Sequence, residues 1–168
     1  MRNPIALALA LAASFNFGGV VWAEPVTVQA ATARMVTATN PASIVKVLQD
    51  SGYRAELASD STGDPMIRSA SSGSNFTILF YGCAEGKDCA TIQFFAGFSE
   101  PENGSITALN AWNAKNRFGR AYRAEDGAAR LEMDLDLDDG GMSTALFEDN
   151  IEFWITIMAS FERHIRGD

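Results

Sequence analysis

Residues 75–99 read NFTILFYGCAEGKDCATIQFFAGFS, two strand-like runs joined by a short polar turn that contains a glycine. This spacing predicts a β-hairpin. Because antiparallel partners keep a constant index sum, placing Cys83 opposite Cys89 fixes the register of every other pair. One face then carries only apolar pairs, such as Phe80 with Ile92. The reverse face is mixed, with Leu79 opposite Gln93, Tyr81 opposite Thr91 and Thr77 opposite Phe95.

Cys83 and Cys89 are the two cysteines of the chain. A disulfide across the hairpin agrees with the hydrophobic register, since a slip of one residue would scramble both faces. The alternatives are a free thiol pair, a redox centre or a metal site. Zinc needs further Cys or His ligands nearby, and dithiol exchange favours a Cys-x-x-Cys spacing. The sequence offers neither here, so we predict a structural disulfide and no metal site.

The first 23 residues have the three parts of a secretory signal peptide. Arg2 gives the positive start, Ile5 to Phe17 the apolar core, and Val21-Trp22-Ala23 a small-x-small cleavage site. An uncleaved membrane anchor is the alternative, because apolar residues continue past the core. A periplasmic or secreted location agrees with a disulfide, which persists in oxidising compartments. Residues 24–39 are predicted to be a linker or a loosely attached strand, and residues 40–168 a single domain.

The charge of the chain limits its partners. The formal net charge is -8, and removal of Arg2 with the signal peptide takes one positive charge away, giving about -9. A protein this acidic is a poor match for the phosphate backbone of a nucleic acid. We therefore predict no nucleic-acid partner, and no membrane association once the signal peptide is cleaved.

The remaining patterns predict helices and further strands around the hairpin. Helices are expected from Pro41 to Gly52, from Ser105 to about Phe118 and from Thr144 to Arg166, and strands at 53–58, 66–70, 120–125 and 128–138. The last helix carries one apolar stripe with spacings of four and three, made of Phe147, Ile151, Trp154, Met158, Phe161 and Ile165. The fold class is therefore α+β, an antiparallel sheet packed with helices in the order α-β-β-β-β-α-β-β-α.

The stretch LEMDLDLD from Leu131 to Asp138 alternates leucine or methionine with acids. This pattern predicts a strand whose apolar side faces the core and whose acids, Glu132, Asp134, Asp136 and Asp138, face the solvent. A weak cation site and the docking of a basic partner are the alternatives. The spacing also resembles the start of a calcium loop, but Asp139 and Ala145 stand where such a loop has glycine and glutamate.

The middle helix carries Asn110, Asn113 and Asn116 at intervals of three, next to Trp112. These side chains are interpreted as helix caps and surface amides, with a polar binding groove as the alternative. The single histidine, His164, lies in the final turn of the last helix, where the expected role is a dipole partner or a surface residue rather than a general base. Without a catalytic constellation, phosphate loop or metal-spaced cluster, we predict no enzyme activity, no catalytic residue and no cofactor.

Several stretches, in one order from about Asn40 to Ile165, resemble the YbjN-like family of bacterial sensory transduction regulators. They are GYRAEL, GDPMIRS, NFTILFYGC, CATIQFFAGF, WNAKNRFGRAY and LEMDLDLDDGG. The family resembles the type III secretion chaperone fold, which implies an α+β sandwich that dimerises and binds a polypeptide. The resemblance carries over no catalytic residue.

Two functions follow as expectations. The first is a non-enzymatic, exported protein-interaction or chaperone-like regulatory module. It would bind a protein partner or form a homodimer through the mixed reverse face, at Leu79, Tyr81 and Phe95, or through the last helix. The alternative is a small-ligand-binding sensory domain with a pocket between the middle helix and the sheet, near Trp112, Asn113 and Asn116.

Overall fold

A computed structural model describes residues 34–167 of the chain. The predicted signal peptide, residues 1–23, lies outside the described residues, as do residues 24–33 of the predicted linker. The elements follow the order β1 (Met35–Val36), α1 (Pro41–Asp50), β2 (Arg54–Ser59), β3 (Pro65–Ser71), β4 (Ser74–Tyr81), β5 (Thr91–Phe98), α2 (Ile106–Lys115), β6 (Arg120–Arg123), β7 (Ala129–Asp136), β8 (Met142–Ser143) and α3 (Thr144–Arg166).

The main sheet has six antiparallel strands in the order β2-β3-β4-β5-β7-β6, and β1 pairs with β8 in a second, two-stranded sheet. The predicted α+β class and the predicted order of helices and strands are confirmed. β8 is additional, and β1 lies in the segment predicted to be a linker or a loosely attached strand. Val36 and Ala38 are buried, so residues 34–39, the described end of the predicted linker, pack against the rest of the fold.

The β4–β5 hairpin has the register that the sequence predicts. Phe80 pairs with Ile92 and Leu79 with Gln93, and the sulfur atoms of Cys83 and Cys89 lie 2.15 Å apart at the hairpin end. Apolar side chains of the two strands alternate onto one face, as the period of two requires. This hairpin forms the centre of the sheet, because β3 continues it on one side and β7 on the other.

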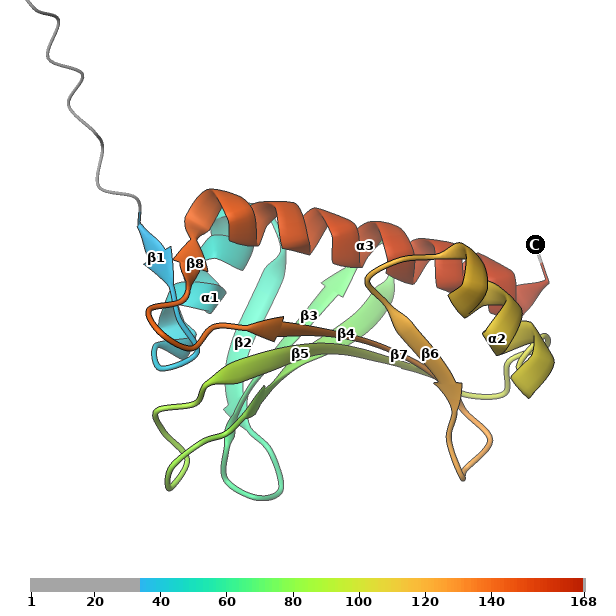
Figure 1. Cartoon of the computed structure of the whole chain (residues 1–168), viewed down its shortest axis with the longest axis horizontal. Helices are drawn as coiled ribbons and strands as arrows, with labels where there is room; N and C mark the ends of the chain where they lie inside the picture. The colour runs from blue at the N-terminus through green and yellow to red at the C-terminus, as the bar shows by residue number, and fades with distance from the viewer. Residues whose placement is uncertain (1–33, 168) are drawn as a thin grey trace, which may run out of the picture. The chain divides into compact units, whose positions relative to one another are not determined.

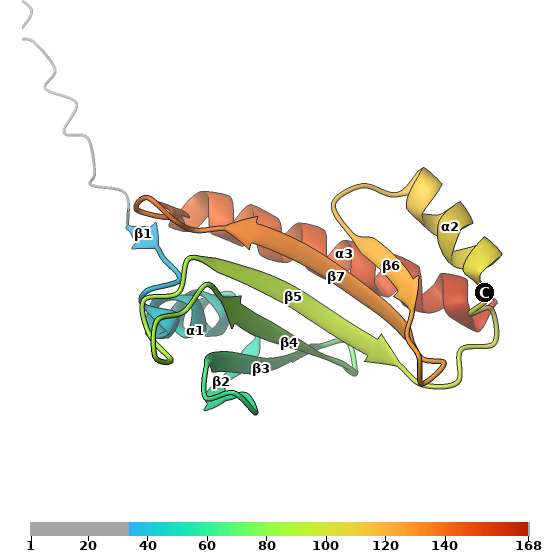
Figure 2. The same cartoon turned by 60° about the horizontal axis from the view of Figure 1, so that its bottom comes forward.

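All three helices lie on one side of the six-stranded sheet (Figure 1). α3 runs across the sheet, with α1 and α2 towards its two ends (Figures 1 and 2). The six stripe residues of α3 predicted to face the core are all buried. Trp154 packs on two sheet residues, with ring centroids 5.9 Å from Phe76 and 5.5 Å from Phe94. The core therefore lies between α3 and the central hairpin.

The middle helix α2 is shorter than predicted. It begins after the N-cap Ser105, whose hydroxyl accepts a hydrogen bond from the Ala108 amide, and it ends at Lys115. Asn116 adopts an extended conformation while its side chain donates to the Trp112 carbonyl, 2.8 Å away. The amide thus satisfies a carbonyl of the last turn, which the helix would otherwise leave without a partner.

Candidate functional site

One face of the six-stranded sheet packs against the helices, and no helix of residues 34–167 covers the other (Figure 2). We call this second surface the open face. Its side chains alternate with the core side chains along every strand. At its centre the open face presents Met66, Leu79, Tyr81, Thr91, Gln93, Phe95, Arg120, Tyr122, Arg130, Glu132 and Asp134.

The open face contains a cavity of about 690 Å³, which we call the open-face cavity. Side chains from four neighbouring strands, β4, β5, β7 and β6, line it: Tyr81, Thr91, Gln93, Arg120, Tyr122, Glu132 and Asp134. The register of the strands brings these side chains together, because Arg120 is paired with Glu132 and Gln93 is paired with Asp134. Tyr81 and Tyr122 come from the two outer strands of the four and flank the others.

Glu132 is the most buried charged side chain of this cavity, and the residue is only 6% exposed. Its Oε1 accepts a hydrogen bond of 2.6 Å from the Tyr122 hydroxyl. Its Oε2 accepts from the Arg120 guanidinium and, at 3.4 Å, from the Gln93 amide. A buried carboxylate is tolerated only when it is paired and hydrogen-bonded, and these three donors meet that need.

Gln93 links the rest of the cavity to Glu132. Its amide nitrogen also donates to Oδ1 of Asp134 at 2.8 Å, and its carbonyl oxygen accepts from the Tyr81 hydroxyl at 3.2 Å. Asp134 remains available on its other oxygen, since Oδ2 lies 3.9 Å from the Arg120 guanidinium and the side chain is 60% exposed. The cavity therefore has a fixed floor of Gln93 and Glu132 and an accessible rim at Asp134.

The pKa values of the two tyrosines reflect the burial and the negative charge of the cavity. Burial raises the pKa of Tyr81, and the negative charges of Glu132 and Asp134 raise it further. Burial also raises the pKa of Tyr122, together with its hydrogen bond to Glu132. Both phenols therefore stay neutral at physiological pH. With two carboxylates against the single guanidinium of Arg120, the lining keeps a net negative charge.

The residues predicted for protein binding surround this cavity. Tyr81 lines it and is 45% exposed, whereas Leu79 and Phe95 are half-buried neighbours. The Arg130 guanidinium carbon lies 5.8 Å from the centre of the Phe95 ring, within the range of a cation–π contact. The structure thus brings the three predicted residues to one surface, and their use in binding stays a prediction.

The residues predicted for a ligand pocket lie elsewhere. Trp112 is 2% exposed and packs on Phe161 of α3, with ring centroids 5.0 Å apart. Trp112 and Asn116 line a cavity of about 270 Å³ between α2 and α3, where His164 joins them. Asn113 does not line it, because its amide is bound to the backbone of β6. His164 Nε2 hydrogen-bonds to the Ala108 carbonyl at 3.0 Å, which ties α3 to α2.

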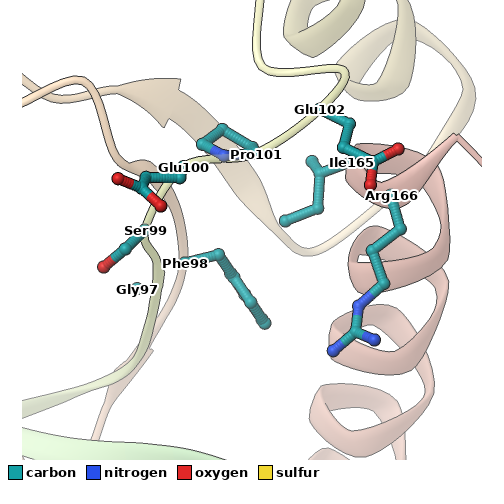
Figure 3. Close-up of a pocket in the computed structure, with 8 residues that line it drawn as sticks. All are labelled: Gly97, Phe98, Ser99, Glu100, Pro101, Glu102, Ile165 and Arg166. Atoms are coloured by element: carbon teal, nitrogen blue, oxygen red, sulfur yellow. The ribbon is translucent and has the colours of Figure 1, made fainter.

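A further cavity, of about 660 Å³, lies between the loop after β5 and the end of α3. Figure 3 shows its lining, with Phe98 and Ile165 between the loop and the helix. Its charged side chains, Glu100, Glu102 and Arg166, are all exposed, and Arg166 already pairs with Glu162. It lacks the buried polar floor that holds the open-face cavity in shape, so we take the open-face cavity as the candidate site.

The sequence prediction for Glu132 was wrong. The alternating pattern placed this residue on a solvated face, but Arg120, Tyr122 and Gln93 cover it. The same pattern is confirmed for the exposed Asp134. Gln93, Arg120 and Tyr122 were not singled out as site residues. The signal for them was the pairing of β5 and β6 with β7, which stacks their side chains beside Glu132.

The open-face cavity presents hydrogen-bonding groups to the solvent. Asp134 and the phenol oxygens present acceptors, and the free N–H groups of Arg120 present donors. Within residues 34–167, no group of three or more His, Cys, Asp or Glu side chains is placed to hold a metal ion. In the same part of the chain, no helix combines the length and apolar character needed to cross a bilayer.

Comparison with known proteins assigns the chain to a family. Residues 40–167 match the YbjN family, described as "Putative bacterial sensory transduction regulator". No curated protein and no solved structure matches, so the likeness to type III secretion chaperones stays a prediction. The family match covers most of the chain and all of its main sheet, and the protein therefore belongs to the YbjN family.

Proposed function

We propose that this protein is an exported, non-enzymatic regulatory module that recognises another protein through the open face of its sheet. The observation that carries the proposal is the composition of that face. Half-buried apolar side chains, Leu79 and Phe95, stand beside a negatively charged cavity with a rigid polar floor. Protein interfaces combine an apolar contact area with a few fixed polar groups in this way.

The charge of the cavity defines the expected partner. Asp134 is exposed at the rim, and the whole chain carries a formal net charge of -8. Tyr81 and Tyr122 add aromatic surface, which favours cations and amphipathic contacts. We expect the partner to place a lysine or arginine side chain in the cavity and apolar side chains on Leu79 and Phe95.

The hydrogen bonding of the titratable groups supports a non-enzymatic role. Each oxygen of Glu132 already accepts a bond from a protein donor, and His164 is held on the Ala108 carbonyl. Groups committed in this way are poorly placed to take a proton from a substrate. The predicted signal peptide and the cysteine pair at disulfide distance support export.

The test is photo-crosslinking of the mature protein in its own compartment, followed by mass spectrometry. A photoreactive residue replaces Phe95, and a matched probe replaces Thr156, which is exposed on the far side of α3. We expect one recurrent partner from position 95, none from position 156, and loss of that partner in Asp134→Lys. Self-crosslinks alone would instead assign the face to a homodimer, and no crosslink from position 95 would contradict the proposal.

A second candidate function is a small-ligand sensory domain, favoured by the volume of the open-face cavity. About 690 Å³ is within the range of small-molecule sites, and Gln93 and Glu132 provide fixed polar groups at its floor. A thermal-shift screen should then show stabilisation by organic amines or guanidines, which Asp134→Asn abolishes. If no cationic ligand raises the melting temperature of the wild-type protein, this second function is contradicted.

A further inference from the structure

The two edges of the six-stranded sheet, β2 and β6, differ in their hydrogen bonding. At β6, the Asn113 side chain occupies both backbone groups of Ala121: it accepts from the amide at 2.9 Å and donates to the carbonyl at 2.9 Å. Along an antiparallel strand, the backbone groups of successive residues point alternately to one neighbouring strand and to the other side. Because the Ala124 amide bonds to Ala128 on the β7 side, the groups of Ala121 point away from β7. Asn113 thus takes the place that an added strand would take.

At β2 the same alternation shows which groups point outward. The Asp60 amide bonds to the Asp64 carbonyl at 2.9 Å, so the even-numbered residues of β2 bond to β3. The backbone N–H and C=O groups of the odd-numbered residues, Ala55, Leu57 and Ser59, therefore point away from β3, toward the outside of the sheet. An independent bond agrees, since the Gln49 amide reaches the Ala55 carbonyl from outside at 3.0 Å.

Beyond Ala55, the outward edge of β2 is open within the described part of the chain. No side chain of residues 34–167 bonds to the backbone of Leu57 or Ser59 in the way Asn113 bonds to Ala121. The Leu57 side chain is 53% exposed, one of the most exposed large apolar residues. It also lines a cavity of about 310 Å³ next to the edge. Edge strands with such features are templates for pairing with another strand.

We propose that β2 pairs with β2 of a second copy of this chain, antiparallel and with its two-fold axis at Leu57. Charge selects this register. Arg54 then lies opposite Asp60 of the second copy, on the same face of the sheet, and the contact occurs twice. Moving the axis one residue toward Ser59 would place Glu56 opposite Asp60, which brings like charges together.

The pairing satisfies the exposed groups of the edge. The backbone groups of Leu57 in one copy exchange hydrogen bonds with those of Leu57 in the other. The backbone groups of Ala55 in each copy exchange hydrogen bonds with those of Ser59 in the other copy. The Ala55 carbonyl has two lone pairs, so it accepts this bond and keeps the one from Gln49. The two Leu57 side chains meet on the helix side of the sheet. This interface uses none of the open-face cavity and is independent of the function proposed above.

The first test is sedimentation velocity of the mature protein over a hundredfold range of concentration. We expect the mass to rise from one chain to two. Hydrogen exchange of the Leu57 and Ser59 amides should slow at least tenfold over the same range, while the Ala121 amide is unchanged. A single-chain mass at every concentration overturns the proposal. The proposal is also overturned if the Leu57 amide is protected from hydrogen exchange to the same degree at every concentration, because another segment of the same chain would then cover the edge.

Two variants locate the interface. Leu57→Pro removes one outward N–H and no bond to β3, and Arg54→Glu places two acids opposite each other. Both should raise the dissociation constant at least tenfold, and the effect of Arg54→Glu should shrink in high salt. Arg54→Lys and Arg68→Glu are the controls, the latter an equal charge change one strand inward. If Leu57→Pro does not fold, Arg54→Glu alone decides, and a dimer that it leaves unchanged contradicts the proposal.

Discussion

Glu132 is buried on a face of the sheet that no helix of residues 34–167 covers, and three neighbouring side chains make this possible. Two of them, Gln93 and Tyr122, are themselves largely shielded from water, whereas the Arg120 side chain is 63% exposed. A buried donor that loses its acceptor costs more than the bond itself contributes. The carboxylate therefore holds the floor of the open-face cavity together.

We predict that Glu132→Leu lowers the free energy of unfolding by about 2 kcal/mol. The Tyr122 hydroxyl and the Gln93 amide lose an acceptor, while the exposed Arg120 turns to water. Urea unfolding followed by tryptophan fluorescence measures the change. Asp134→Asn, at the exposed rim, is the matched control and should change the free energy by less than about 0.5 kcal/mol. Equal effects of the two substitutions would contradict a structural role for the buried carboxylate.

The raised pKa values of Tyr81 and Tyr122 predict a loss of stability in alkali. Ionisation is harder in the folded state than in the unfolded state, where a tyrosine titrates at about pH 10. The stability is fully present below that pH and is lost as pH rises through the higher folded values. Urea midpoints from pH 8 to 11 should fall less steeply in the Tyr81→Phe, Tyr122→Phe double variant. An unchanged slope would show that ionisation of these two phenols does not cause the loss.

Among the elements, α3 and the β4–β5 hairpin could be predicted closely from the sequence. Their signals are local: a continuous stripe from Phe147 to Ile165 in α3, and alternation around a short turn in the hairpin. The pairing of β5 with β7 could not be predicted, because α2 and β6 lie between them in the chain. Glu132 was therefore predicted to face the solvent, and of the residues that line the candidate site only Tyr81 was predicted to bind a partner.

Asn113 shows a second limit of sequence reasoning at the level of elements. Its spacing with Asn110 and Asn116 indicates a polar side of α2, and nothing in that spacing indicates a contact with β6. The contact depends on how α2 returns to the sheet edge, which only the folded chain shows. The three asparagines consequently have three different roles, at a sheet edge, at a helix end and on the surface.

We predict that Asn113→Ala lowers the free energy of unfolding by about 1–2 kcal/mol, because two hydrogen bonds to Ala121 are lost. Hydrogen exchange at the Ala121 amide should become faster in the same variant. Asn110→Ala is the matched control, since this residue is exposed on the same helix, and alanine is the better helix former. The interpretation fails if the exchange at Ala121 is the same in both variants.

For the molecule as a whole, the cysteine pair joins the two central strands beyond their last register pair, Tyr81 and Thr91. A cross-link that closes a loop of this length stabilises a fold by about 2 kcal/mol in the chain-entropy model. The pair therefore links the location of the protein to its stability, because an exported chain acquires the bond and a chain in a reducing compartment does not.

We predict that replacing Cys83 and Cys89 together by alanine lowers the free energy of unfolding by about 2 kcal/mol. Wild-type protein unfolded with and without reductant provides the matched comparison, and the reduced form should resemble the double variant. Mass analysis of the mature protein after alkylation should find no free thiol. Two alkylated cysteines in protein from the oxidising compartment would contradict both the bond and the stability difference.

The difference in hydrogen bonding between the edge strands β2 and β6 limits how many copies a strand-paired assembly can contain. A strand-paired assembly elongates only if each added unit offers a new free edge, as in a fibre. Here the side chain of Asn113 occupies backbone groups of the edge strand β6. Two copies joined through β2 would therefore have an occupied β6 edge at each end, and no further copy could add there. In the proposed pair, Asn113 and the helix α2 that carries it keep both β6 edges from accepting a further strand.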